Sequence, residues 1–176
     1  MIIAFMTVLF IVGLIISTRF VHKNEPVQTQ KNQDKQQINA TLKLTVSNKQ
    51  IRVGDTLKIV VSVDTAQNIS ASDIVLAYDP TFLEFDQEKL ISKTYSIVRV
   101  LSENGTLIIS LLENENLSGK TPRNNDIVTI PFTLLKKGNT TIKPVLSDVG
   151  TTSTLLFGND TKNQLSHVLP LELSIQ

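Results

Sequence analysis

The stretch that decides the fold class is residues 51–63, IRVGDTLKIVVSV, in which apolar and polar side chains alternate. Successive side chains of a β-strand point to opposite faces, so a repeat of two residues places every second side chain on the same face. The second half of the stretch has aliphatic residues at this spacing. These residues are Leu57, Ile59, Val61 and Val63. The stretch therefore predicts a half-buried β-strand rather than an amphipathic helix.

Turn residues stand beside this pattern and beside a later one. Gly54 and Asp55 come directly before the strand and are expected to form a turn. Glycine tolerates the positive φ of a tight turn, and the aspartate carboxylate accepts hydrogen bonds from nearby amides. Asp79 and Pro80 end a second alternating run, since proline fixes φ and lacks an amide proton. Tyr78 is expected to pack its ring inward and bond its hydroxyl to buried backbone. The alternative is a flat ring that is presented to a sugar or a peptide.

Alternating runs of this kind recur through the chain after residue 38. They are short, turn residues separate them, and none shows the i, i+3, i+4, i+7 apolar stripe of a core helix. Without crossover helices a parallel sheet is not expected. We predict an all-β fold, an antiparallel β-sandwich. Its nine predicted strands are residues 41–46, 57–63, 73–78, 95–101, 106–112, 127–135, 140–146, 154–157 and 167–175.

Residues 1–18 form a separate segment, because none of them is charged and nearly all are aliphatic, Phe or Met. As a helix this segment reaches about 27 Å, close to the roughly 30 Å hydrocarbon core of a bilayer, whereas the apolar part of a secretion signal has about 7–15 residues. We expect an uncleaved transmembrane anchor, with a cleaved signal or a buried core helix as alternatives. Residues 19–38 are rich in Gln, Asn and Lys, and they are expected to form a flexible linker.

The overall composition excludes several classes of function. The chain of 176 residues has 17 basic and 16 acidic side chains, and a net charge of +1 gives no field for binding a nucleic-acid backbone. The absence of cysteine excludes disulfides, thiolate metal sites and cysteine nucleophiles. The two histidines, His22 and His167, form no metal-binding cluster. We therefore expect no cofactor and no nucleic-acid partner.

Carboxylates are numerous enough to supply a glycosidase pair, but they lie in polar stretches where ordinary ionised carboxylates are expected. No nucleophile motif such as G-x-S-x-G is present, so we expect no catalytic activity. Asp148, Asn159 and Asp160 offer oxygen ligands for calcium, but they lack EF-hand spacing and we assign no metal site. The acids considered for catalysis are Glu84, Asp86, Glu88, Glu113 and Glu115.

Three segments, taken in order, carry a resemblance to a known family: residues 51–63, then ISASDIVLAYDPTFLEF at 69–85, then GTLIISLLENENLSG at 105–119. Together they resemble a cohesin module, in which a Gly-Asp turn opens a strand, a later strand ends in Tyr-Asp-Pro, and Leu-Glu follows. The matching positions are Gly54, Asp55, Tyr78, Asp79, Pro80, Leu83 and Glu84. The later segments are similar to the closing strands of the family, so the resemblance extends over residues 39–176.

This resemblance implies a nine-stranded jelly roll related to family 2 and family 3 carbohydrate-binding modules. It also implies a non-catalytic receptor for dockerin modules in polysaccharide-degrading assemblies. Under the resemblance, Asp73 and Glu113 stand at carboxylates that contact the dockerin, and Asn114 stands where the family has a further acid. The alternative for Asp73 and Glu113 is a solvated charge that discourages aggregation between sheets.

We therefore expect residues 39–176 to be a cell-surface binding module for protein assembly or adhesion, linked to polysaccharide binding and breakdown. The alternative is a carbohydrate-binding module that recognises polysaccharide directly, but after residue 38 the chain has no Trp and only Tyr78 and Tyr95 besides four Phe. We expect this domain outside the cell. Arg19, His22 and Lys23 follow the anchor and favour the opposite orientation under the positive-inside rule, so the orientation stays open.

Overall fold

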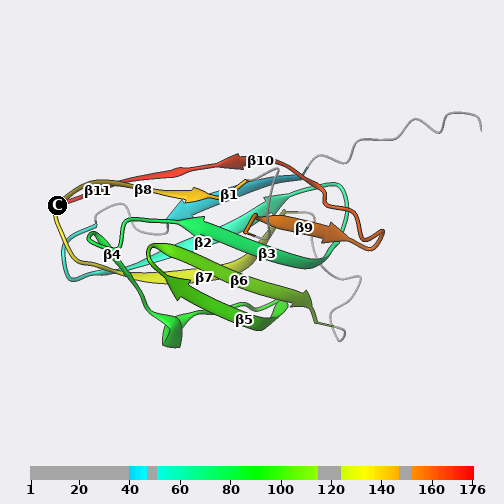
Figure 1. The fold of residues 1–176 in the computed structure, drawn as a ribbon, viewed down its shortest axis with the longest axis horizontal. Helices are drawn as coiled ribbons and strands as arrows, with labels where there is room; N and C mark the ends of the chain where they lie inside the picture. Colours follow the sequence, from blue (N-terminus) through cyan, green and yellow to red (C-terminus); the bar gives the residue numbers. More distant parts are fainter. Residues whose placement is uncertain (1–39, 47–50, 115–123, 147–151) are drawn as a thin grey trace, which may run out of the picture. The chain divides into compact units, whose positions relative to one another are not determined.

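The computed structural model describes residues 40–46, 51–114, 124–146 and 152–176 (Figure 1). All of them belong to one unit of the chain, residues 37–176. The predicted anchor, residues 1–18, and nearly all of the predicted linker fall in the other unit, and both lie outside the described residues. Within the described ranges, no helix combines the length and the apolar character needed to cross a membrane.

The strands form two sheets. One has five strands in the order β10-β1-β2-β7-β4, and the other has six, in the order β11-β8-β3-β6-β5 with β9 also paired to β3. The first sheet consists of β1 (Ala40–Val46), β2 (Thr56–Asp64), β4 (Leu83–Phe85), β7 (Asn124–Leu134) and β10 (Leu165–Leu169). The second consists of β3 (Ile69–Ala77), β5 (Tyr95–Glu103), β6 (Thr106–Glu113), β8 (Gly138–Pro144), β9 (Leu155–Gly158) and β11 (Leu171–Ile175). A short 3₁₀ helix, η1 (Gln87–Lys89), lies between β4 and β5.

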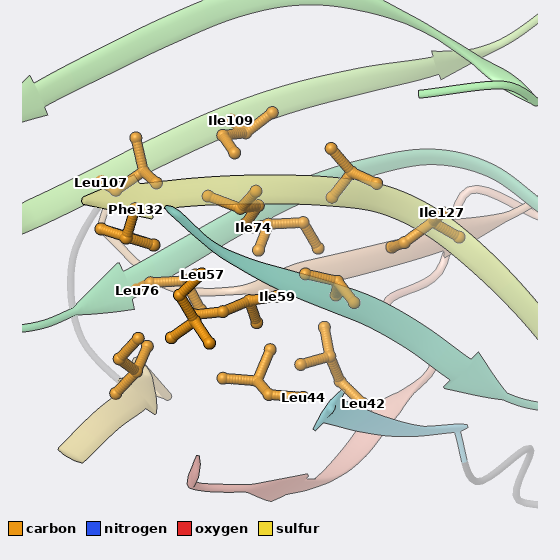
Figure 2. Packing of buried hydrophobic residues seen from close by; sticks show 14 of the residues in the cluster. Leu42, Leu44, Leu57, Ile59, Ile74, Leu76, Leu107, Ile109, Ile127 and Phe132 are labelled. Atoms are coloured by element: carbon orange, nitrogen blue, oxygen red, sulfur yellow. The ribbon is translucent and has the colours of Figure 1, made fainter. Parts of the chain in front are cut away.

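The two sheets share one hydrophobic core, in which side chains from β2 and β3 point toward one another (Figure 2). The predicted buried face of β2 is confirmed, because every second residue from Leu57 to Val63 is at most 2% exposed. Burial of one such aliphatic side chain contributes about 1.5–3 kcal/mol, so the alternation itself holds the two sheets together. The all-β sandwich predicted from the sequence is therefore the observed fold.

The number of strands differs from the prediction, because the described residues contain eleven strands and not nine. One additional strand is β4, whose three residues are too few to show a periodicity. The other arises because residues 167–175 do not form one strand: β10 pairs with β1 in one sheet and β11 pairs with β8 in the other. Pro170 lies between them, and its missing amide proton interrupts the ladder where the chain changes sheets. The β1–β10 pair is parallel, so the sandwich is not wholly antiparallel.

The predicted turns are confirmed in their details. Gly54 has a φ of +88°, and Asp55 accepts a 3.0 Å hydrogen bond from the backbone N–H of Arg52 through Oδ2. After β3, Oδ1 of Asp79 accepts hydrogen bonds from the backbone N–H and the hydroxyl of Thr81, at 2.8 and 2.7 Å. These two bonds lower the pKa of Asp79. Both carboxylates therefore have a structural role in turns.

Tyr78 packs inward, as expected, with its ring edge against Phe132 at a centroid distance of 5.0 Å. Its hydroxyl is 3.1 Å from the Ser102 hydroxyl rather than bonded to buried backbone. The tyrosine that does donate to buried backbone is Tyr95, whose hydroxyl is 3.0 Å from the carbonyl oxygen of Ile69. Tyr78 is half-buried, so the structure shows the packing but does not test the alternative of a ring face presented to a ligand.

Candidate binding face

The register of the second sheet determines which of its side chains point away from the core. In β3, Ile74 and Leu76 belong to the core, so alternation places Asp73 and Val75 on the outer side. Directly paired residues point to the same side, and the β3–β6 and β6–β5 pairings extend this assignment over three strands. We call this set of outward side chains the β3–β6–β5 face. Its central members are Ala71, Asp73, Val75, Arg99, Leu101, Ile108, Ser110 and Leu112.

A polar row crosses the middle of the β3–β6–β5 face. Asp73 pairs with Ser110, and Ser110 pairs with Arg99, so a carboxylate and a guanidinium stand on the same side with one strand between them. Neighbouring strands lie about 4.8 Å apart, which separates the backbones of Asp73 and Arg99 by roughly 10 Å. The row offers a partner one acidic and one basic group, with a hydroxyl between them.

Apolar side chains flank the polar row. On one side Leu112 is 52% exposed. On the other side Ile108 pairs with Val75 and with Leu101, of which Val75 is buried and Leu101 is 40% exposed. Val98 falls in the register shift of β5 and is 62% exposed. Exposed apolar anchors beside a few polar groups are typical of the centre of a protein interface.

The outer side of the first sheet has a different character. Lys43, Ser62 and Asp126 form a row over β1, β2 and β7, and the Ser62 hydroxyl donates a 2.9 Å hydrogen bond to Oδ1 of Asp126. The neighbouring row of the same strands is Thr-Val-Thr, with Val60 partly buried. Exposed apolar side chains stand only at the margins of these two rows, Leu169 beside Lys43 and Ile91 beside Thr129. The β3–β6–β5 face is therefore the stronger candidate for a binding surface.

Glu113, the second predicted contact residue, does not lie with Asp73. It ends β6 opposite Tyr95, and because it is three residues after Ser110, alternation puts it on the same side of the strand as Leu111. Burial, and secondarily the charge of Glu113, raise the pKa of Tyr95 to about 12. The structure thus places Asp73 within the β3–β6–β5 face and Glu113 at the strand end, turned to the other side.

One of the acids considered for catalysis is bound in an ion pair. Asp86 and Lys89 form an ion pair with an N–O distance of 2.6 Å, and this bond lowers the pKa of Asp86, whereas a general acid needs a raised one. Glu84 is exposed on β4, and Glu115 and Asp148 lie outside the described residues. Within the described parts of the chain, no three His, Asp or Glu side chains are grouped so that they could hold a metal ion.

Sequence analysis missed the apolar members of the face, although β6 contained a signal. Its core residues recur with period two, but Ile108 and Leu112 are also apolar and fall on the alternate positions. A strand that is apolar on both sides has either a second buried face or an exposed apolar one. Arg99 carried no such signal, because its place beside Ser110 depends on the β5–β6 register.

The fold and the face together define a class, a two-layer β-sandwich module whose second sheet carries exposed apolar side chains beside charges. Residues 40–176 match the family model of the cohesin domain, and the chain belongs to the cohesin family. The resemblance found in the sequence is thereby confirmed. Cohesin domains are non-catalytic modules that bind proteins, so the prediction that this domain is not an enzyme is confirmed as well. No curated protein matches the chain.

Solved cohesin structures have the same fold at low sequence identity. A type II cohesin domain from the cellulosome of Acetivibrio cellulolyticus is 17% identical with a TM-score of 0.59, over 77% of this chain and 95% of that one. A cohesin module from a family 33 glycoside hydrolase of Clostridium perfringens is 14% identical with a TM-score of 0.61, over 79% and 96%. The cohesin of a type I cohesin–dockerin complex from Clostridium thermocellum is 19% identical with a TM-score of 0.57, over 77% and 99%.

Proposed function

We propose that this protein is a cell-surface receptor for a dockerin-type protein partner, which docks on the β3–β6–β5 face. Cohesins of similar fold are described in complexes with dockerins, one from Clostridium thermocellum and one from Acetivibrio cellulolyticus. Their identity to this chain is at most 19%, so the partner has to be argued from the surface itself.

The observation that carries the proposal is the contrast between the two outer sheet surfaces. The β3–β6–β5 face combines the exposed Leu101 and Leu112 with the charges of Asp73 and Arg99. Apolar anchors supply most of the affinity at the centre of an interface, while the charges on either side of Ser110 give orientation and specificity. On the first sheet the exposed apolar side chains of the described residues, Leu169 and Ile91, stand at the margins of the polar rows, and at the centre Ser62 already bonds to Asp126.

Direct recognition of polysaccharide is the less favoured function. Sugar-binding surfaces stack the sugar rings on exposed aromatic side chains. The large exposed apolar side chains of the described residues are all Val, Ile or Leu, and none is aromatic. The link to polysaccharide breakdown is therefore proposed to pass through the protein partner, which would carry the catalytic or sugar-binding module.

Residues 1–18 are proposed to anchor the protein in the cell membrane, and residues 19–38 to hold the domain away from it. The length and composition of the first segment support this proposal, and the basic residues that follow it oppose an external domain. Protease treatment of intact cells tests the orientation. Release of the domain from intact cells supports an external domain, and protection until the cells are lysed means that the domain faces the cytoplasm.

The binding proposal is tested by capture and affinity measurement with the full chain in detergent, against secreted proteins that carry dockerin segments. Leu112→Ala and its control Leu169→Ala remove leucines of similar exposure, 52% and 48%, from the proposed face and from β10. Asp73→Asn and its control Asp126→Asn remove one charge from the outer side of each sheet. We expect Leu112→Ala and Asp73→Asn each to weaken binding by about tenfold, and the controls to change it by less than about twofold.

Equal effects of the test and control variants would assign the partner to another surface. Retention of the chain on polysaccharide, without capture of any dockerin-bearing protein, would favour the carbohydrate-binding alternative. Glu113→Gln tests whether Glu113 contacts the partner, as the family resemblance implies, although the register of β6 turns it away from the β3–β6–β5 face. If this change weakens binding as much as Asp73→Asn does, the partner reaches around the end of β6 to the side of the strand that carries Leu111.

A further inference from the structure

The strand β5 is the longest free edge of the described sheets. It ends the order of the six-stranded sheet, with β6 as its only hydrogen-bonded neighbour there (Figure 1). It has nine residues, of which seven are exposed, whereas the edge strands β4, β10 and β11 have three, five and five. Proteins protect sheet edges with short strands, proline, charged side chains or bulges. The segment from Arg99 to Glu103 has no proline, the bulge of β5 lies before it, and its two charges are opposite in sign. An edge of this kind is suited to pair with another strand.

The hairpin turn determines which backbone groups of β5 are unpaired. Asn104 and Gly105 have φ values of +49° and +76°, as in a two-residue type I′ turn. In such a hairpin the residues that flank the turn exchange both backbone hydrogen bonds, and bonded pairs then alternate along the ladder. Glu103, Leu101 and Arg99 therefore bond to β6, and the residues between them, Val100 and Ser102, direct N–H and C=O toward the free edge.

The side chains of this segment are complementary to a copy of themselves. Arg99, Leu101 and Glu103 point to the same outer side of the sheet, since their partners on β6 are Ser110, Ile108 and Thr106. A two-fold axis at Leu101 places Leu101 against Leu101 of a second antiparallel strand. The same axis places Arg99 opposite Glu103 twice, once on each side of the leucine pair. Opposite charges facing each other across an antiparallel ladder stabilise it, and like charges destabilise it.

We propose that two copies of this chain associate through antiparallel pairing of β5 with β5, centred on Leu101. In this register Val100 of one copy exchanges N–H to C=O hydrogen bonds with Ser102 of the other, which gives four bonds over the two symmetric pairs. These are the backbone groups that the hairpin leaves unpaired. The apolar row from Val75 through Ile108 to Leu101 then continues into the second copy, so the two outer faces become one surface.

The partner of the β5 edge is argued to be a second copy of this chain and not an unrelated extended peptide, because the charges are arranged symmetrically and the regular segment is short. The register shift between Ile97 and Arg99 ends the regular segment on one side, and the turn at Asn104 ends it on the other. An isologous pairing about Leu101 uses all the residues between these limits and closes on itself, so it gives a dimer and not a fibre. A foreign strand would need its own matching acid and base at the same spacing.

Single cysteines test the register, because the chain contains none of its own. At the two-fold axis residue 101 forms a non-hydrogen-bonded pair, with Cα atoms about 4.5 Å apart, which lies within the range that a disulfide spans. Full chain carrying Leu101→Cys is oxidised in detergent by oxygen with a copper–phenanthroline catalyst. We expect a covalent dimer on non-reducing gels. Val98→Cys is the control on the same strand, since the proposed register keeps its two copies roughly 20 Å apart.

Charge reversal tests the pairing without cysteine. Arg99→Glu and Glu103→Arg each place like charges opposite one another twice, and we expect either change to abolish the dimer in sedimentation velocity. The combined variant Arg99→Glu with Glu103→Arg restores both opposite-charge pairs and should restore the dimer. Circular dichroism checks that each variant is folded, as expected for exposed side chains. Cross-linking of Val98→Cys as fast as that of Leu101→Cys, a monomer at all concentrations, or no recovery in the combined variant would overturn the proposal. None of these assays includes a dockerin, so the outcome is independent of the proposed function.

Discussion

Tyr95 leads to a prediction that connects the core of the second sheet to one of the sequence-predicted contact residues. Its side chain is 5% exposed, its hydroxyl donates to the carbonyl oxygen of Ile69, and Glu113 stands opposite it. Burial is the main reason that the pKa of Tyr95 is raised to about 12, and the charge of Glu113 adds to it. A buried tyrosinate beside a carboxylate is unfavourable in the folded state, so folding keeps this proton bound.

The sign and the size of the effect on stability follow from this shift. The pKa of an unfolded tyrosine is about 10, so the folded state binds the proton more tightly by about two pKa units, on the order of 2–3 kcal/mol. This stability is fully present below pH 10 and is lost as the pH rises from about 10 to about 12. The protein should therefore unfold more readily between about pH 10 and about pH 12, because the Tyr95 hydroxyl loses its proton in that range.

The assay follows tyrosinate absorbance and circular dichroism together during an alkaline titration. The chain has two tyrosines, so a Tyr78→Phe background leaves Tyr95 as the only source of the signal. We expect absorbance and unfolding to change together near pH 12. Tyr95→Phe should remove the part of the alkaline destabilisation that belongs to this proton. Glu113→Gln should lower the midpoint by less than one pH unit, because the carboxylate is the smaller of the two causes.

The reasoning would be refuted if tyrosinate appeared near pH 10 while the circular dichroism stayed native. That result would mean that the hydroxyl is solvated and not bonded to the buried carbonyl oxygen of Ile69. An unchanged midpoint in Glu113→Gln would mean only that the carboxylate stands too far from Tyr95 to affect its pKa.

Two further predictions concern stability, and urea unfolding or thermal melting followed by circular dichroism checks them. Gly54→Ala should cost about 1 kcal/mol, because φ is +88° but a Cβ there would meet nothing within 4 Å. Gly105→Ala should cost at least about 1 kcal/mol more, since its Cβ would lie 2.5 Å from the carbonyl oxygen of Tyr78; equal costs would contradict this packing. Thr154→Val should cost about 2 kcal/mol or more, because the hydroxyl accepts from the N–H and donates to the C=O of the buried Val75, at 3.1 and 2.9 Å. Thr154→Ser keeps the hydroxyl and should retain most of the stability, and an equal loss in both variants would assign the effect to side-chain packing.

The parts of the fold that the sequence predicted correctly are those that depend on local pattern. Period-two alternation identified β2 and β6 because each has one face in a shared core, and no other repeat satisfies that requirement. The turn at Gly54 was predictable because only a few residue types adopt its φ. The family resemblance added the order of the segments, which local patterns alone do not supply.

The features that were not predicted depend on contacts between distant segments. Pro170 is a local sign of an interruption in residues 165–175, but only the pairing with β1 and with β8 shows that the two halves belong to different sheets. Pairing of β10 with β1 joins residues more than 120 positions apart in parallel, which no turn signal reports. The row of Asp73, Ser110 and Arg99 also exists only through two registers.

The separation of Asp73 from Glu113 shows which kind of signal is reliable on a sheet surface. The resemblance assigned both carboxylates to the partner by their positions along the chain. Side-chain direction depends instead on whether two residues are separated by an even or an odd number of positions. Glu113 comes three positions after Ser110, so its carboxylate lies on the opposite side of β6. Leu112 is two residues after Ser110, so it stands on the same surface as Ser110 and Asp73. At 52% exposure this leucine leaves apolar surface uncovered beside a charged row, and that is the surface which the proposed partner would bury.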